Sequence, residues 1–296
     1  MNALTRVGKE TDILGECPLW DEVAQALWWV DIRRPALRRL DYRSGRVETW
    51  PMPDLVGAIA FCDDGRLLVA LPDRIAAFDS TTEGFVTVAA PPTVNPGHRF
   101  NDGRCDRQGR FWVGTMHNVT RAPEGVLYRL DASGRVTAKH SGICIPNSLA
   151  WSPDGRTMYF ADSLRYTIFA YDYDPDTGEM SAERVFATSA KPAFADGSTV
   201  DAEGFLWNAE FNGWRVVRYA PDGRIDRVIK VPTQRPTCCA FGGPDLDILY
   251  ITTASQQMSA DELARQPLAG SLLAMDAGVR GLREPRFPLS KLPIKE

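Results

Sequence analysis

Side chains able to bind a cation recur at one position of a repeated segment in this 296-residue chain. The segment is a turn, usually rich in Asp and Gly, followed by a short run of β-branched and aromatic residues. Its six copies begin at Asp21, Cys62, Asp106, Ser152, Asp201 and Gly242. Five residues before these starts stand, in the same order, Glu16, Gly57, Asn101, Asn147, Asp196 and Thr237, which we call the column. Four of the six column residues carry a carboxylate or an amide.

The chemistry of the column points to a divalent cation. Two carboxylates, Glu16 and Asp196, repel one another unless protons or a cation compensate their charge. Oxygen ligands suit a hard ion such as Ca²⁺, Mg²⁺ or Mn²⁺, and Zn²⁺ or Fe²⁺ also bind them. A purely structural role is the alternative, because Asn and Asp before Gly are ordinary turn residues, as in Asn101-Asp102-Gly103 and Asp196-Gly197. Agreement of four copies at one offset favours the metal site.

The repeat also predicts the fold that must position these side chains. Its copies start 41 to 49 residues apart and each carries four strand signals, which is typical of the blades of a β-propeller. We therefore expect an all-β protein, a six-bladed β-propeller with four-stranded blades around a central channel. The leading segment Leu4–Lys9 has no hairpin partner, so we expect it to complete the last blade and close the ring. The column residues begin the innermost strands and are expected to meet at one mouth of the channel.

Composition excludes several classes of protein. A net charge of −4 argues against nucleic-acid binding, which requires a basic surface. No apolar run approaches the ~18 residues of a membrane span, and residues 1–14 lack the apolar core of a signal peptide. The six cysteines show no Cys-x-x-Cys spacing and are typical of buried thiols in a reducing compartment. We expect one domain over residues 1–296 in a cytoplasmic protein that is a monomer or a weak homo-oligomer.

Several motifs resemble, in order, those of the family of senescence marker protein (regucalcin), gluconolactonase and luciferin-regenerating enzyme. The resemblance runs from about Leu14 to Met275, and the chain is most similar to the bacterial sugar-acid lactonases. The segments that carry it are Gly15–Trp20, Arg99–Gly103, Gly114–Met116, Pro146–Ser152 and Asp196-Gly197.

The resemblance implies one catalytic divalent ion (Ca, Zn, Mn, Mg or Fe) on the axis of the propeller. Carried over by motif, the metal ligands are Glu16, Asn147 and Asp196. The substrate-contacting residues are Arg99 and Asn101. Animal members carry acidic residues after Gly-Thr-Met, where this chain has His117-Asn118-Val119. This substrate contact therefore differs from that of the animal members, and the resemblance does not identify the sugar that is accepted. From its own position after a strand, His117 is a further candidate for binding a sugar hydroxyl.

Together these features predict a metal-dependent hydrolase that opens a sugar-acid lactone, such as a pentonolactone or gluconolactone, to the aldonic acid. Asp196 is the expected catalytic residue, taking a proton from the attacking water. Three alternatives remain open: a phosphotriester (organophosphate) hydrolase using the same metal, a non-catalytic metal-binding regulatory protein, and a propeller that binds a protein partner. A serine-histidine-aspartate mechanism has no support, because the Gly-x-Ser-x-Gly motif is absent from the sequence.

Overall fold

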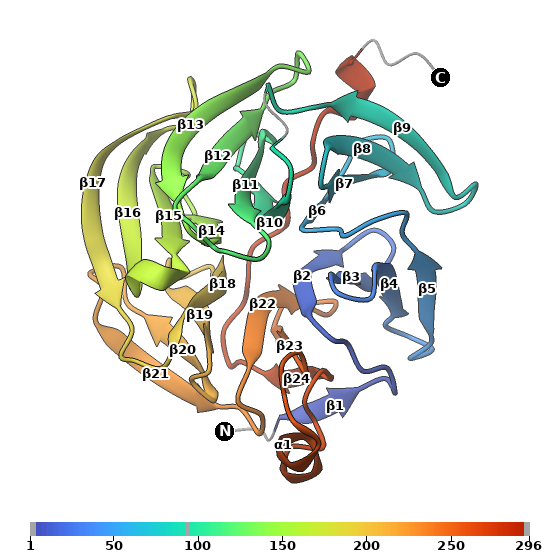
Figure 1. Cartoon of the computed structure of the whole chain (residues 1–296), viewed down its shortest axis with the longest axis vertical. Helices are drawn as coiled ribbons and strands as arrows, with labels where there is room; N and C mark the ends of the chain where they lie inside the picture. The colour runs from blue at the N-terminus through green and yellow to red at the C-terminus, as the bar shows by residue number, and fades with distance from the viewer. Residues whose placement is uncertain (1–3, 93–94, 293–296) are drawn as a thin grey trace.

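The computed structural model describes residues 4–92 and 95–292. Six four-stranded antiparallel sheets surround a central axis, as the sequence repeat predicts (Figure 1). The innermost strands β2, β6, β10, β14, β18 and β22 contact one another around the ring. Within the described ranges, no helix is long and apolar enough to cross a membrane.

The strands follow the chain blade by blade. Blade one contains β2 (Gly15–Asp21), β3 (Ala26–Asp31), β4 (Ala36–Asp41) and β5 (Val47–Pro51), and blade two β6 (Ile59–Phe61), β7 (Leu67–Leu71), β8 (Arg74–Asp79) and β9 (Gly84–Ala89). Blade three contains β10 (His98–Cys105), β11 (Phe111–His117), β12 (Gly125–Leu130) and β13 (Val136–Ile143). Blade four contains β14 (Pro146–Trp151), β15 (Thr157–Asp162), β16 (Thr167–Asp174) and β17 (Glu179–Thr188), with the short helix η1 (Ser163–Arg165) after β15. Blade five contains β18 (Phe194–Val200), β19 (Leu206–Phe211), β20 (Arg215–Tyr219) and β21 (Ile225–Lys230).

Blade six is completed by the N-terminal strand, which confirms the predicted closure of the ring. Strand β1 (Thr5–Val7) pairs with β24 (Leu272–Asp276), which follows β22 (Pro236–Gly242) and β23 (Ile248–Thr253). Between β23 and β24 lies the helix α1 (Ala260–Arg265). Ser259 caps it and exchanges hydrogen bonds with Glu262, which satisfies free N–H groups of the first turn.

The Asp that starts three of the six copies has a local physical role. The Asp201 side chain accepts hydrogen bonds from the backbone N–H groups of Glu203 and Phe205, both at 3.0 Å, and so builds the turn between β18 and β19. Its second oxygen accepts the indole N–H of Trp207 at 2.8 Å. Asp106 holds the equivalent turn of blade three through the N–H groups of Gln108 and Arg110. The local turn chemistry therefore explains the repeat.

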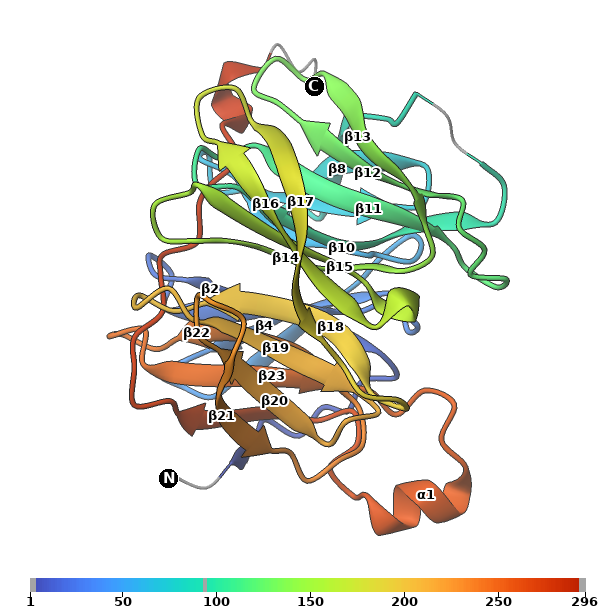
Figure 2. The same ribbon diagram turned by 90° about the vertical axis from the view of Figure 1, so that its left-hand side faces the viewer.

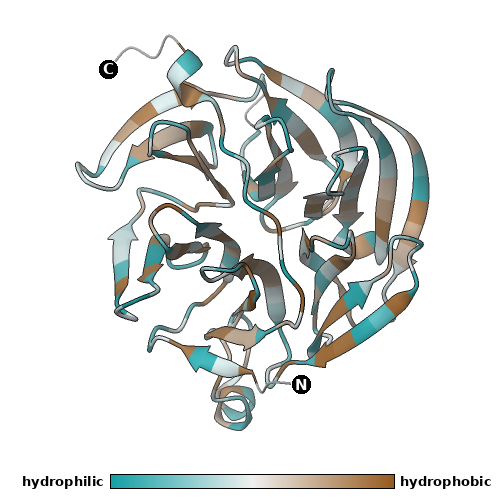
Figure 3. Ribbon diagram, turned by 180° about the vertical axis from the view of Figure 1, so that it is seen from behind, coloured by the Kyte–Doolittle hydropathy of each residue, from teal (hydrophilic) through white to brown (hydrophobic). Residues whose placement is uncertain are grey.

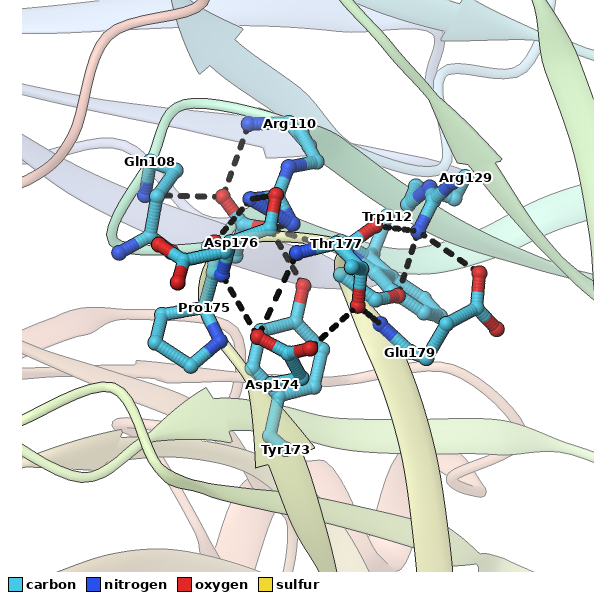
Figure 4. Close-up of polar contacts among 12 residues, drawn as sticks. Gln108, Arg110, Trp112, Arg129, Tyr173, Asp174, Pro175, Asp176, Thr177 and Glu179 are labelled. Carbon is cyan, nitrogen blue, oxygen red and sulfur yellow. Dashed lines mark hydrogen bonds and ion pairs between the residues drawn. The ribbon is translucent and has the colours of Figure 1, made fainter.

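Polar contacts also fasten neighbouring blades at their outer edges. Figure 4 shows Arg129 of β12 reaching the turn between β16 and β17, where Nη1 donates to the carbonyl oxygen of Thr177 at 2.9 Å. The Tyr173 hydroxyl of blade four donates to Asp106 of blade three at 2.5 Å. Trp112 and Trp151 are buried beside them and pack in one hydrophobic cluster.

A C-terminal segment crosses one end of the channel, a feature that the repeat does not predict. Residues 277–292, which include the short helix η2 (Leu289–Lys291), pass over the back of the ring in Figure 3. Gly281 pairs there with Asp201, and the fully buried Phe287 pairs with Cys62. Figure 2 shows this segment on the face opposite α1. The column residues lie toward the uncovered mouth.

Candidate active site

β-Bulges aim the column residues at the axis. In five of the six inner strands the pairing register shifts at the column: between Glu16 and Leu19, Phe100 and Gly103, Asn147 and Ala150, Ala195 and Ser198, and Pro236 and Cys238. A bulge bends its strand and re-aims a side chain, and bulges are frequent beside active sites. In blade two the column residue is Gly57, which precedes β6 and where a Cβ atom would lie 2.3 Å from the Phe100 carbonyl oxygen. Only glycine fits there.

Five of the six predicted site residues line one cavity. It has a volume of about 120 Å³, and those five are Glu16, Arg99, Asn101, Asn147 and Asp196. The stacked rings of Phe194 and Phe211, with centroids 5.2 Å apart, add an apolar wall. A wider groove of about 380 Å³ between blades four and five contains none of the predicted site residues. The smaller cavity is therefore the candidate active site.

A chain of hydrogen bonds fixes the orientation of the amides in this cavity. Arg99 Nη1 donates to Asn101 Oδ1 at 2.8 Å, and Asn101 Nδ2 donates to Asn147 Oδ1 at 3.0 Å. Asn147 Nδ2 donates to Ser163 Oγ at 2.8 Å, and Ser163 in turn donates to the Ala195 carbonyl oxygen at 2.7 Å. Because the Ser163 proton is used on a carbonyl, this hydroxyl can only accept from Asn147. The Asn147 Oδ1 atom is thereby turned away from Ser163 and toward Asn101.

Three carboxylates lie close enough to oppose one another's ionisation. Burial, followed by the charge of Asp102, raises the pKa of Glu16 from 4.5 to about 8. Burial, followed by the charges of Glu16 and Asp102, raises the pKa of Asp196 well above its usual value, although Arg99 acts in the opposite direction. Burial also raises the pKa of Asp102, whose carboxylate accepts the N–H of Leu149 at 2.9 Å. The cavity floor therefore favours added positive charge, as protons or as a cation.

The chemistry of these side chains fits a divalent cation. The Glu16 carboxylate accepts only the N–H of its neighbour Cys17, at 3.3 Å, and no side chain of the described residues donates to the Asp196 carboxylate. Buried carboxylates without such partners are costly unless a cation or proton is supplied. No group of three or more His, Cys, Asp or Glu side chains is arranged to hold a metal within residues 4–92 and 95–292. A site here has to include an amide oxygen, which Asn147 provides.

His117 is the one predicted site residue that does not line the cavity. Its Nδ1 atom accepts the backbone N–H groups of Val119 and Thr120, at 3.3 and 3.1 Å. Its ring packs edge-on against His98, with centroids 5.1 Å apart. Contact of His117 with a substrate stays a prediction.

The two remaining column residues, Gly57 and Thr237, do not line the cavity. Gly57 has no side chain, and the Thr237 hydroxyl donates to the Gly15 carbonyl oxygen at 2.5 Å. Thr237 thereby links blade six to blade one and does not line the cavity.

Several residues of the site are not evident from the sequence. Asp102 follows a column residue in the sequence, but its charge affects the pKa values of Glu16 and Asp196 only because the closed ring brings the three side chains together. Ser163 acts only through Asn147. Arg33, Arg121 and Arg235 also line the cavity, from connecting segments outside the repeat. The only signal for them is that Arg33 and Arg121 follow second strands of blades, close to the place that His117 has at the end of β11.

Comparison with known proteins gives consistent matches over nearly the whole chain. A model of the SMP-30/gluconolactonase/LRE-like region matches residues 14–255. The chain is 38% identical to 6-deoxy-6-sulfogluconolactonase of Pseudomonas putida, over 95% of this chain and 97% of that protein. It is 38% identical to L-arabinolactonase of Azospirillum brasilense, over 96% and 95%. A solved structure described as the calcium-binding protein regucalcin, from Agrobacterium tumefaciens, has a TM-score of 0.93 and 32% identity over 97% of each chain.

The matched range includes all column residues and the cavity residues from Leu14 to Asn212 and Arg235. The fold, the order of the motifs and the identity to relatives agree. This chain belongs to the SMP-30/gluconolactonase/LRE-like family.

Proposed function

We propose that this protein hydrolyses the ring ester of a sugar-acid lactone, with a divalent cation held by Glu16, Asn147 and Asp196. The chain is an enzyme of the carboxylic-ester hydrolase class, as the lactonases among its relatives are. The observation that carries the proposal is one small cavity that combines two carboxylates and an amide with the polar pair Arg99 and Asn101. Regucalcin from Agrobacterium tumefaciens, described as calcium-binding, supports the cation.

Asp196 is the proposed general base. Its carboxylate accepts a proton from water as the water oxygen adds to the lactone carbonyl carbon. The ring C–O bond then breaks, and the same proton passes to the leaving ring oxygen, which becomes a hydroxyl group. The product is an open-chain carboxylic acid that ionises at neutral pH. When bound, a divalent cation supplies Lewis acidity toward the carbonyl oxygen and favours the ionised form of the carboxylates around it.

The rest of the cavity orients a polyhydroxylated ring. Arg99 and Asn101 already bond to each other and to fixed backbone groups, so little freedom is lost when they bind hydroxyl groups. The aromatic pair Phe194 and Phe211 offers an apolar surface to the carbon face of a sugar. A cavity volume of about 120 Å³ suits a small molecule.

The test is a panel of sugar lactones, followed by release of acid at neutral pH and corrected for spontaneous opening. One arm contains a phosphotriester, and each arm is repeated after treatment with a chelator. We expect hydrolysis of at least one lactone, no turnover of the phosphotriester, and loss of activity with chelator. Turnover of the phosphotriester alone, or of no lactone with any added divalent ion, would refute the proposal.

A further inference from the structure

Two arginines that line the cavity have no partner of their own. Arg33, between β3 and β4, and Arg121, between β11 and β12, both reach the cavity lining. Within the described part of the chain, neither guanidinium makes a hydrogen bond or an ion pair, although the backbone N–H groups of both residues are bonded. Arginine side chains in a fold are normally held by carboxylates or carbonyls. Here two of them face a cavity with free donors.

The other two arginines of the lining donate their hydrogen bonds to neutral groups, although the charges of Glu16 and Asp196 also act on Arg99. Arg99 donates from Nε to the neutral amide of Asn118, at 3.0 Å. Arg235 donates to Asn212 Oδ1 at 3.3 Å and to the Gln256 carbonyl oxygen. Four arginines thus line a cavity that contains two carboxylates, Glu16 and Asp196. This excess of positive charge lies in a protein whose net charge is −4.

The charges of the arginines act on one another. Burial, followed by the charge of Arg121, lowers the pKa of Arg33. Burial, followed by the charge of Arg33, lowers the pKa of Arg99 to about 9, and Arg121 adds to the effect. Four arginines beside only two carboxylates repel one another, which costs free energy. A bound anion would remove that cost.

The depth at which each lining residue lies in the cavity indicates which part of a bound substrate would carry the anionic group. Asn147 and Asp196 are buried, as is Arg99, whereas Arg33 and Arg121 remain partly open to solvent. Asp196 and Asn147 therefore lie at the floor, and the two unpartnered arginines lie nearer the mouth. We propose that Arg33 and Arg121 form an anion subsite, so that the lactone carries a carboxylate, sulfonate or phosphate group on the part of the molecule farthest from the ring carbonyl. This inference rests on the proposed lactone hydrolysis.

Two other uses of the arginines lead to different expectations. If they held the carboxylate of the opened product, they would act equally on all lactones, since every lactone yields that group. If they served only the fold, their loss would lower stability, but within the described residues their guanidinium groups have no hydrogen bond or ion pair to lose. The cavity volume of about 120 Å³ admits a small molecule and no macromolecule.

The experiment compares gluconolactone with analogues that differ only in a carboxylate, sulfonate or phosphate on the carbon farthest from the carbonyl. Each is hydrolysed by the wild type, by Arg33→Gln and by Arg121→Gln. Arg43→Gln is the matched control, because it removes the same charge from an exposed turn between β4 and β5. Arg33→Lys and Arg121→Lys keep the charge and lose the forked pair of donors.

We expect the wild type to prefer one of the anionic analogues over gluconolactone by at least tenfold in kcat/KM. Arg33→Gln and Arg121→Gln should each lower kcat/KM for that analogue by about 10- to 100-fold, the range for a charge-assisted hydrogen bond. The loss of kcat/KM on gluconolactone should be at least about tenfold smaller than the loss on that analogue, and the lysine variants should fall between the wild type and the glutamine variants. The best of the three analogues identifies the group. Equal turnover of neutral and anionic lactones by the wild type, or equal losses on both, would overturn the inference and leave the lactonase proposal standing.

If no lactone is hydrolysed, the proposed function is refuted, but the anion subsite can still be tested by a binding measurement. Inorganic sulfate and phosphate are titrated into the wild type, the two glutamine variants and the Arg43→Gln control by calorimetry. Binding to the wild type and the control, and at least tenfold weaker binding to the variants, supports the anion subsite. Equal binding to all four proteins, or binding to none, overturns it.

Discussion

Ser163 orients the proposed metal ligand Asn147 and does not itself line the cavity. Its replacement by alanine tests this orienting role separately from its contribution to stability. The Ser163 hydroxyl accepts from Asn147 Nδ2 at 2.8 Å and donates to the Ala195 carbonyl oxygen at 2.7 Å. In Ser163→Ala the Asn147 amide loses the contact that fixes which end faces the cavity. We expect the variant to fold but to present the Asn147 oxygen less often.

The magnitude follows from the bonds that are lost. Two buried hydrogen bonds disappear, and each leaves a polar group unsatisfied at a cost of ~1–3 kcal/mol, so the free energy of unfolding should fall by about 2–6 kcal/mol. Removing a residue that orients a metal ligand typically weakens metal affinity by about 10- to 100-fold. The expected loss in binding free energy is therefore ~1.4–2.8 kcal/mol.

The assay is a calorimetric titration of chelator-treated protein with Ca²⁺ and with Mn²⁺, together with thermal unfolding of the same sample. Ser198→Ala is the control, because the Ser198 hydroxyl is also buried and lies 2.9 Å from both Ser148 Oγ and Asn208 Nδ2. It contacts no proposed ligand side chain, so it should lose stability and keep its affinity for the ion. Equal weakening by both substitutions, or wild-type affinity in Ser163→Ala, would refute the orienting role.

Three more predictions concern the cavity. Asp196→Asn should fold and keep some metal, with kcat at least ~10²-fold lower because the general base is gone; normal turnover with metal retained would remove Asp196 from that role. Asn101→Ala should cost ~1–3 kcal/mol in kcat/KM with metal content unchanged, and loss of the metal would instead make Asn101 a ligand. Because the pKa of Glu16 rises from 4.5 to about 8 in the folded protein without metal, its contribution to stability is complete below pH 4.5 and is lost as the pH rises through about 8. The melting temperature of chelator-treated protein should therefore fall between about pH 5 and about pH 8, and a saturating divalent ion should reduce this fall. A melting temperature that does not change with pH in the treated protein would contradict this expectation.

The repeat made the fold predictable, because each copy carries its own turn chemistry. Asp106 and Asp201 build their turns from hydrogen bonds within a few residues, and such local patterns are visible in the sequence. Alignment of the copies then placed Glu16, Asn147 and Asp196 at equivalent points of a closed ring. The cavity gathers these three side chains as the alignment predicts.

Features that depend on contacts between distant segments could not be predicted in this way. The C-terminal segment over the far mouth has no periodic pattern, and Phe287 gains its burial only from blade two. His117 ends the second strand of its blade, just before the kind of connecting segment that carries Arg33 and Arg121, yet loop N–H groups hold its Nδ1 atom. The direction of such a side chain is set by hydrogen bonds of its own loop, which the sequence does not reveal.

The central claim is that a single divalent ion in this cavity is required for lactone hydrolysis. The most direct measurement is the rate of hydrolysis of the best lactone by chelator-treated protein as a divalent ion is added in steps, with Glu16→Gln treated in parallel. Activity should be absent at the start, rise in proportion to added ion, and level off at one equivalent per chain. Glu16→Gln should require a large excess of ion. Full activity without added ion, in a protein sample that elemental analysis shows to contain no metal, would contradict the account.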